Sequence, residues 1–223
     1  MTKIKLNLPL EKAHRIISPR IGYIVTTVDA KGLVNAAVFS NLTSVSTKPE
    51  RLVLAVYKPW DTIRNIRQTK EFVVNVPHKN LMEKVWICGD KYAGNPIPPK
   101  INELKVAALT EIHSKKVRPP RVAECSMHLE CKVKWIKDVG NHYLVLGEVV
   151  AASYTKGVFN GNWRQVVSKT KPLLEIGGGL FTYPEKEIRV NQKKVHAYVA
   201  KWLDKKKIRV SRKLEKYNGF KRA

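Results

Sequence analysis

Long apolar runs are missing from this 223-residue sequence. No segment approaches the roughly 18 consecutive apolar residues that a membrane-spanning helix needs. The segment from Met1 to Pro9 also lacks the apolar core of a secretory signal peptide. The composition, with 43% hydrophobic and 8% aromatic residues, is nevertheless that of a folded domain, which argues against general disorder and low-complexity chains. We therefore expect a folded protein without a membrane span.

Cysteine is scarce as well. The three thiols, Cys88, Cys125 and Cys131, are odd in number and show no C-x-x-C spacing. Such a set predicts neither a disulfide framework nor a zinc site. Together with the missing signal peptide, this leads us to expect a reducing compartment and a cytoplasmic location.

The motifs of several enzyme classes are absent. The serines of residues 40–46 are not part of a G-x-S-x-G turn, and the six histidines show no H-E-x-x-H or other metal-ligand spacing. Gly177-Gly178-Gly179 is not followed by Lys-Ser/Thr, so a tight turn explains it better than a phosphate-binding loop does. The sequence argues against a hydrolase and predicts no metal site.

Acidic residues are few, since 18 Asp and Glu stand against 42 Lys and Arg, for a net charge of +24. Residues 185–223 hold 14 of the basic and 4 of the acidic residues, so +10 of the net charge lies there. The run from Lys205 to Lys213 would suit nucleic acid, an anionic membrane surface or an acidic partner. A solvated helix face is the plainer alternative, and the aromatic interleaving of a base-stacking surface is thin.

β-branched and aromatic residues recur in short runs between turn signals. Residues 20–28 and 33–39 flank the turn sequence Asp29-Ala30-Lys31-Gly32 and predict a hairpin. Residues 52–56 and 72–76 are nearly continuous apolar runs, which predict strands covered on both faces. Asp61 and Thr62 are possible caps of a helix between these two strands.

Residues 127–135 alternate between apolar and polar side chains, which predicts a strand with one face in the core and the other in water. A turn at Gly140 leads into residues 142–153, which we expect to form the antiparallel partner of this strand. Strands in hairpins with peripheral helices favour a mainly β fold, an antiparallel barrel, over a parallel doubly wound sheet. We expect a domain over residues 1–184 and a basic helical extension over residues 185–223.

Two polar stretches stand out in this framework. Residues 40–47 gather hydroxyl and amide side chains where the chain leaves the first hairpin. Residues 58–65 place a cation, Lys58, just before a helix N-terminus, whose backbone N–H groups favour an anion. Together they suggest a site for a phosphate-bearing cofactor. Turn and helix capping by the same side chains is an equally good interpretation of the residues alone.

Several strings in the same order resemble the flavin reductase-like, FMN-binding split-barrel family. They are Ile24-Val25-Thr26-Thr27-Val28-Asp29 with Asn35-Ala36-Ala37, then Val45-Ser46-x-x-Pro49, Asp61-Thr62-Ile63-Arg64-Asn65-Ile66, Phe72-Val73-Val74-Asn75, the segment 114–124, His128-Leu129-Glu130-Cys131-Lys132-Val133, and Gly140-Asn141-His142 with Gly147-Glu148-Val149. The resemblance extends over about residues 14–183. It does not cover the basic extension, and Lys58-Pro59-Trp60 is bulkier than is usual for the family.

The resemblance implies a mainly β, antiparallel Greek-key split barrel with peripheral helices, forming a homodimer with FMN near the subunit interface. Carried over residue by residue, the isoalloxazine edge would lie along Ser40, Asn41, Leu42 and Thr43. The ribityl and phosphate groups would bind Ser46, Thr47, Lys58, Thr62 and Asn65. His142 is the expected residue beside the nicotinamide, although a histidine at the start of a strand also has an ordinary structural explanation.

The resemblance further implies an oxidoreductase in which NAD(P)H reduces the bound flavin. Electrons then pass to free flavin, a ferric complex or a protein partner. Such flavin chemistry needs no catalytic acid or nucleophile from the protein, which agrees with the absence of hydrolase and metal-site motifs. An FMN-binding electron carrier that does not itself oxidise NAD(P)H is the alternative. A basic barrel that binds nucleic acid is the rival from another class, and we do not expect nucleic acid to be the partner.

Overall fold

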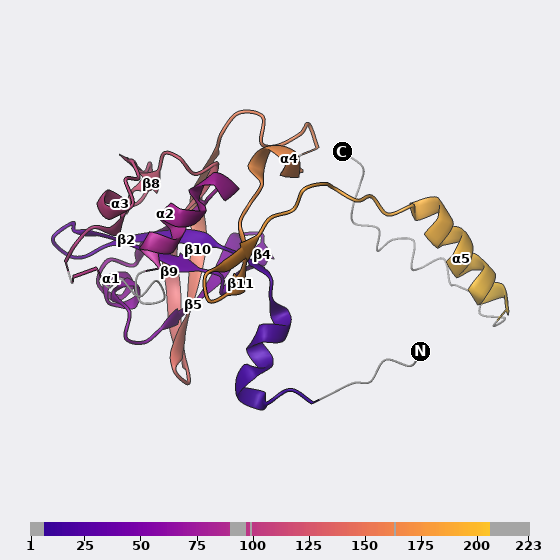
Figure 1. Ribbon diagram of the computed structural model, residues 1–223, viewed down its shortest axis with the longest axis horizontal. Helices are drawn as coiled ribbons and strands as arrows, with labels where there is room; N and C mark the ends of the chain where they lie inside the picture. The colour runs from indigo at the N-terminus through magenta and orange to yellow at the C-terminus, as the bar shows by residue number, and fades with distance from the viewer. Residues whose placement is uncertain (1–6, 90–96, 99, 163, 206–223) are drawn as a thin grey trace.

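The computed structural model describes residues 7–89, 97–98, 100–162 and 164–205 of the chain. Its centre is an antiparallel seven-stranded sheet with the strand order β3-β2-β6-β9-β10-β5-β4 (Figure 1). These strands are β2 (Tyr23–Val28), β3 (Val34–Phe39), β4 (Leu42–Thr47), β5 (Glu50–Tyr57), β6 (Glu71–Val76), β9 (Met127–Val139) and β10 (His142–Tyr154).

Two smaller sheets and several short helices surround the large sheet. The remaining strands are β1 (Arg20–Ile21), β11 (Leu174–Gly177) and β12 (Leu180–Thr182) in one sheet, and β7 (Glu111–Ile112) and β8 (Arg121–Val122) in another. The α-helices are α1 (Asp61–Thr69), α2 (Met82–Cys88), α3 (Glu103–Val106), α4 (Val167–Thr170) and α5 (Gln192–Lys205), and the 3-10 helices are η1 (Leu10–Ile17) and η2 (Lys79–Leu81).

The outermost strands of the large sheet, β3 and β4, are joined directly by Ser40 and Asn41. Because so short a connection brings the first and last strands of the order together, the sheet curls into a barrel that stays open between them. The mainly β, antiparallel split barrel expected from the sequence is confirmed. Its first hairpin is also confirmed, since β2 pairs antiparallel with β3 from Tyr23↔Phe39 to Val28↔Val34.

The sheet has a hydrophobic cluster on each of its two faces. The cluster inside the barrel includes Val25, Leu54 and Phe72. The second cluster includes Ile24 and Val85 and joins the outer face of β2 and β3 to α2 and α3. Side chains alternate across a strand, so β2 contributes to both clusters and is buried along nearly its whole length.

The two strands predicted from apolar runs, β5 and β6, differ in whether both of their faces are buried. β6 is buried on both faces, as predicted. β5 is instead buried only at alternate positions, at Leu52, Leu54 and Val56, and the prediction of two covered faces is wrong there. It lies between β10 and the outer strand β4, and its other positions are only partly buried or exposed.

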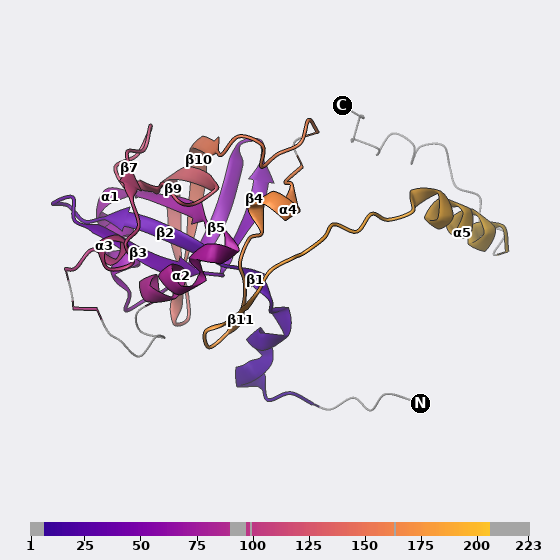
Figure 2. The same cartoon turned by 45° about the horizontal axis from the view of Figure 1, so that its top comes forward.

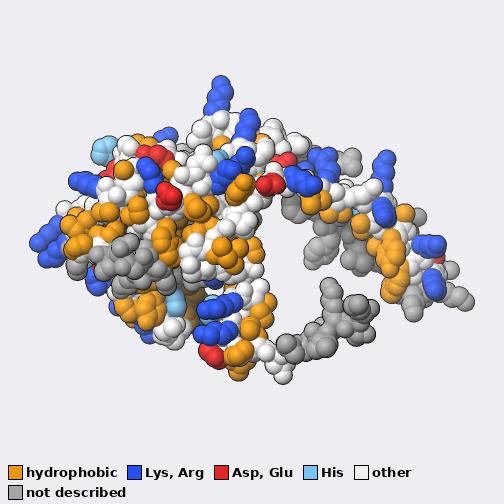
Figure 3. Space-filling model, in the orientation of Figure 1, with side chains coloured by type: hydrophobic (Ala, Val, Ile, Leu, Met, Phe, Trp, Pro, Cys, Tyr) orange, Lys and Arg blue, Asp and Glu red, His pale blue; other side chains and the backbone are white. Residues whose placement is uncertain are grey.

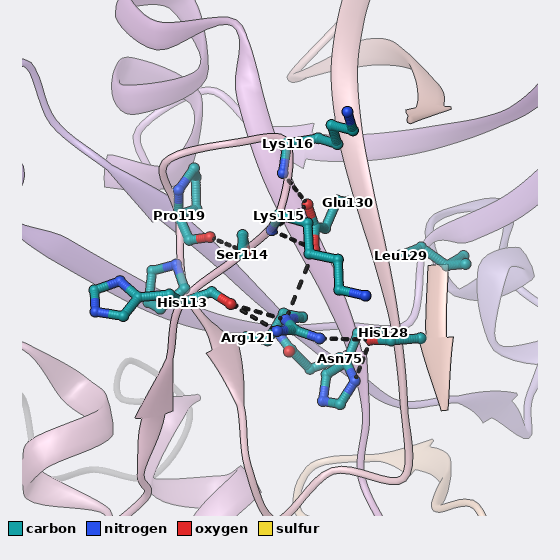
Figure 4. A network of polar contacts seen from close by, with 12 residues as sticks. Asn75, His113, Ser114, Lys115, Lys116, Pro119, Arg121, His128, Leu129 and Glu130 are labelled. Carbon is teal, nitrogen blue, oxygen red and sulfur yellow. Dashed lines mark hydrogen bonds and ion pairs between the residues drawn. The ribbon is translucent and has the colours of Figure 1, made fainter. Parts of the chain in front are cut away.

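The wet face that the alternation predicts for β9 is present at Lys132 and Lys134, which are exposed, but not at the start of the strand. Glu130 and His128 lie on the polar face but are only 2% and 6% exposed. The loop before β8 covers Glu130 (Figure 4), whereas the ring of His128 lies 2.8 Å from the carbonyl oxygen of Val122 in β8 and 3.2 Å from Ser153 Oγ in β10. Glu130 accepts hydrogen bonds of 2.7–2.9 Å from the N–H groups of Lys115 and Lys116. A covering loop with inward N–H groups therefore makes the first part of this polar face part of the interior.

Apolar side chains at the far end of the same strand are exposed. Trp135 is 43% exposed and Val139 is 41% exposed. The β9–β10 hairpin extends beyond the rest of the sheet at this end (Figure 1), so the apolar face has nothing to pack against there. Among the described residues, no helix is both long and apolar enough to cross a bilayer.

Candidate functional site

A cavity of about 600 Å³ lies between the outer edge of β3 and the N-terminal half of α1. We call it the β3–α1 cavity. Its lining comes from the β2–β3 turn, β3, the start of α1, the end of α2, residues 97–98 and residues 100–103: Asp29, Ala30, Lys31, Leu33, Val34, Asn35, Ala36, Ala37, Val38, Pro59, Trp60, Asp61, Thr62, Arg64, Asn65, Gln68, Cys88, Gly89, Ile97, Pro98, Lys100, Ile101 and Glu103. This volume lies within the range of small-molecule and cofactor sites.

Two of the predicted cofactor residues, Thr62 and Asn65, line this cavity. Both belong to α1 and are nearly buried, at 1% and 7% exposed. The amide nitrogen of Asn35 donates to Thr62 Oγ1 at 3.3 Å and to Thr27 Oγ1 at 3.4 Å, and the amide nitrogen of Asn65 donates to Thr27 at 3.1 Å. These contacts fix the first turn of α1 against β2 and β3. They also leave the hydroxyl hydrogen of Thr62 for another acceptor.

The carboxylates of the cavity lining are each held by the protein. Asp29 Oδ1 accepts 2.8 Å hydrogen bonds from the N–H groups of Lys31 and Leu33 in the turn. Glu103 Oε2 accepts a 2.8 Å hydrogen bond from the N–H of Ala36 on the outer edge of β3. The third carboxylate, Asp61, pairs with Arg64.

The described part of the lining also holds three cations, equal in number to its carboxylates, and one of them, Arg64, is the partner of Asp61. Lys31, Arg64 and Lys100 line it, and the α1 N-terminus adds a partial positive charge. The residue before the helix, Trp60, places no side-chain hydrogen bond on this end. An anionic group at the start of α1 would meet these cations and the first backbone N–H groups of the helix.

The structure places Lys58 and His142 together, outside the lining of this cavity. Lys58 Nζ forms a 2.7 Å ion pair with Asp138 on the β9–β10 hairpin. The ring of His142 packs on Tyr57 with centroids 5.3 Å apart, and its Nδ1 lies 2.6 Å from Asn141 Oδ1. Partial burial lowers the pKa of His142 below its ordinary value of 6.5, so the ring is neutral at pH 7.

An aromatic chain connects this pair to the cavity. The ring of Trp60, which lines the cavity, packs edge-on against the rings of Phe39 and Tyr57. The ring centroids are 5.3 Å and 5.8 Å apart. Tyr57 in turn contacts His142. Tyr57 therefore lies between Trp60, which lines the cavity, and His142, which does not.

The remaining predicted residues follow β3 out of the barrel and run along the outer strand β4. Ser40 and Asn41 form the connection, and the side chain of Asn41 accepts a hydrogen bond from Arg20. The others lie on β4: Leu42, Thr43, Ser46 and Thr47. Most of β4 is exposed, with Val45 at 52%. The stretch of hydroxyl residues is therefore an open edge strand, and none of it lines the cavity.

Sequence reasoning missed Asn35 and Lys100 as site residues. Asn35 carries a signal that could have been found, because it is a polar residue inside an apolar strand. Lys100 carries none, since it approaches β3 only through the fold. Within the described part of the chain, no group of three or more His, Cys, Asp or Glu is placed to hold a metal ion.

The three thiols are buried and take no part in an open site. Cys88 lines the cavity wall but is 3% exposed, and burial raises its pKa to about 12. Burial also raises the pKa of Cys125 and of Cys131. All three are free cysteines, and all three side chains stay protonated at neutral pH.

Comparison with known proteins gives a consistent result. A family model described as a flavin reductase like domain matches residues 17–180. An uncharacterized protein from Aquifex aeolicus is 31% identical over 169 residues, which cover 73% of this chain and 83% of the relative.

Two solved structures illustrate the shared fold. The 2-nitrobenzoate 2-nitroreductase NbaA of Pseudomonas fluorescens superposes with a TM-score of 0.71 at 25% identity, covering 85% of this chain and 95% of that one. An FMN-binding protein from Thermus thermophilus, with bound 1-cyclohex-2-enone, superposes with a TM-score of 0.69 at 18% identity, covering 85% and 100%. The second likeness concerns the fold alone.

Proposed function

This chain belongs to the flavin reductase-like family, and on that premise we propose that it is an oxidoreductase that binds FMN in the β3–α1 cavity. The observation that carries the proposal is the combination, in one 600 Å³ cavity, of a helix N-terminus, cations and a flat aromatic wall. The Thermus thermophilus protein of the same fold is described as FMN-binding, which supports this choice of flavin.

The lining suits the parts of FMN. The phosphate would be held at the start of α1 by Thr62, Arg64 and Lys100, where an anion is favoured. The ring would lie against Trp60 and the small side chains of Ala36 and Ala37 on the outer edge of β3, an arrangement that keeps water from one side of it. Asn65 would hold the helix in place through Thr27.

FMN supplies the two-electron and one-electron redox chemistry when it is bound. The chain's own contribution is to bind, to orient and to exclude water. We propose NAD(P)H as the electron donor, with His142 orienting the nicotinamide, and free flavin, a ferric complex or a protein partner as the acceptor. Ser40, Asn41, Leu42, Thr43, Ser46, Thr47 and Lys58 remain proposals for contacts with the ring and ribityl chain.

A homodimer is part of this proposal. The open edge strand β4 exposes Val45, and η1 exposes Leu10 at 89%, Ile16 at 73% and Ile17 at 64%. Exposed apolar side chains on an unpaired strand edge and on a projecting helix suit burial by a second copy. A partner over β4 would also bring the hydroxyl residues of that strand into an enclosed environment.

We also propose the division into a flavin-binding domain over residues 1–184 and a basic extension over residues 185–223, and a cytoplasmic location. The family match ends at residue 180, which supports the division.

Titration of the purified full-length chain with FMN tests the proposal, followed by absorbance and by quenching of flavin fluorescence. We expect saturable binding and, after anaerobic addition of NADH or NADPH, loss of the absorbance of oxidised flavin. A chain that binds no FMN would contradict the proposed function. Binding without reduction by either nucleotide would favour the electron-carrier alternative.

A further inference from the structure

Helix α5 lies apart from the barrel, at the end of an extended segment that follows residue 182. Figures 1 and 2 show it at a distance from the sheet in both views. Its start is fixed locally, since the side chain of Asn191 accepts a 3.0 Å hydrogen bond from the N–H of Lys194. The extended segment is attached to α4 through Glu187, whose side chain accepts a 2.9 Å hydrogen bond from the N–H of Val167.

One face of α5 is apolar and exposed. Val195, Tyr198, Val199 and Trp202 follow the i, i+3, i+4, i+7 spacing and are 47%, 70%, 45% and 47% exposed. At 3.6 residues per turn they form a single stripe along the helix. Figure 3 shows hydrophobic side chains gathered along this helix with basic ones beside them.

The charges of the helix lie beside this stripe. Lys194, Lys201 and Lys205 follow the spacing i, i+7, i+11, which places them on one flank, next to Tyr198. Asp204 is the one acidic residue in the sequence of α5. The long aliphatic parts of the lysines can extend from the edge of an apolar surface while their ammonium groups stay in water.

This combination points to one kind of partner. A second copy of α5 would bring its own lysines against these lysines, which disfavours pairing of this helix with itself. Nucleic acid would pair with the lysines but would leave the Val and Trp stripe in water. The surface of an anionic bilayer satisfies both features, because phosphate groups meet the lysines while the stripe enters the boundary between headgroups and acyl chains.

We propose that α5 is an interfacial anchor, which binds the chain to bilayer surfaces that contain anionic phospholipids. The helix lies in the plane of the surface with Val195, Val199 and Trp202 directed inward. The extended segment before α5 separates the helix from the barrel, so the barrel would stay in water while α5 lies on the bilayer. This inference does not depend on the flavin.

Flotation of the full-length chain with lipid vesicles tests the anchor. One vesicle is pure phosphatidylcholine and the other contains about 30% phosphatidylglycerol. We expect binding to the anionic vesicle at least about tenfold tighter than to the neutral one. Substituting Lys194, Lys201 and Lys205 together by Gln should weaken binding about a hundredfold, at about 1 kcal/mol for each charge. Trp202→Ser should weaken it about tenfold.

A matched control removes the same charge from the barrel, with Lys115, Lys116 and Lys132 changed to Gln. It should bind vesicles within about threefold of the unchanged chain, and the melting temperature of the barrel should be the same in all variants. Equal loss in the control and α5 variants would overturn the proposal, because it would mean adsorption by net charge. Unchanged binding of Trp202→Ser, or tighter binding to double-stranded DNA than to the anionic vesicle at about 150 mM salt, would also overturn it.

Discussion

The Nε atom of Arg121 lies 3.7 Å from a carboxylate oxygen of Glu130, whose side chain is only 2% exposed. The same guanidinium donates to the carbonyl oxygen of His113 at 2.6 Å and to Ser153 Oγ at 2.9 Å. Figure 4 shows that Arg121 thereby links the loop before β8 to strands β9 and β10. The loop, the buried acid and the two strands form one connected polar network.

Glu130→Gln tests the strength of this network. The change keeps the shape of the side chain but replaces one acceptor oxygen by an N–H₂ group, which would face the N–H donors of Lys115 and Lys116. We expect the free energy of unfolding to fall by about 1–3 kcal/mol in urea denaturation. Glu148→Gln is the matched control, because the Arg51 and Glu148 pair is more exposed. A loss in the control as large as that in Glu130→Gln would contradict the argument.

The buried ring of His128 predicts a pH dependence of stability. Burial is the main cause that lowers its pKa below the ordinary 6.5. The unfolded chain then binds the proton more readily, so stability is lost as the pH falls below about 6.5. We expect the melting temperature to decline from pH 7 to pH 5 and the decline to be shallower in His128→Gln. His196→Gln, on α5, serves as the control and should keep the unchanged slope.

Gly147 offers a test of packing inside the barrel. A Cβ atom at this position would lie 2.5 Å from Cζ of Phe72 and 3.3 Å from Cβ of Cys131. We expect Gly147→Ala to lower the free energy of unfolding by about 1–3 kcal/mol. Gly161→Ala has nothing within 4 Å and should be nearly neutral. Adding Phe72→Leu to Gly147→Ala should cost less than the sum of the two single changes, and strict additivity would refute the proposed clash.

The phosphate position proposed for FMN can be separated from the ring position. Lys100→Gln removes a cation from the cavity lining. We expect the Kd for FMN to rise about tenfold while the Kd for riboflavin, which has no phosphate, stays unchanged. Lys116→Gln, far from the lining, is the control. An equal rise for both ligands would place Lys100 at the ring or would indicate a structural effect.

His142 can be tested as an orienting residue for the nicotinamide. Its ring is neutral at pH 7 and packs on Tyr57, away from the cavity lining. We expect His142→Ala to raise the KM for NADH or NADPH about tenfold and to leave the Kd for FMN unchanged. Steady-state kinetics with flavin titration measures both. A change in FMN affinity alone would assign His142 to the flavin site instead.

The barrel could be predicted from the sequence because its strands carry local signals. The turn at Asp29 to Gly32 and the apolar runs of β2 and β6 depend on neighbouring residues only, so hairpin and strand positions follow from them. The burial of Glu130 and His128 could not be predicted in this way. It arises because the loop before β8 folds back over β9, and hydropathy alone does not reveal such a fold-back.

In the candidate site, too, residues with a local sequence signal were predicted and residues brought in by folding were not. Thr62 and Asn65 were found because a helix N-terminus leaves a pattern in the sequence. Lys100 and Glu103 were missed because they approach β3 only after folding. The sequence also gave no sign that Lys58 would pair with Asp138, which is 80 residues away along the chain.

The burial of all three cysteines bears on how the chain can be handled. A flavoprotein that reacts with oxygen produces peroxide beside its own side chains, and peroxide attacks thiolates far faster than thiols. With the pKa of Cys88 raised to about 12 and all three sulfurs enclosed, none of them offers a thiolate to such an oxidant. The three thiols of the folded protein should therefore stay reduced during aerobic storage without added reductant.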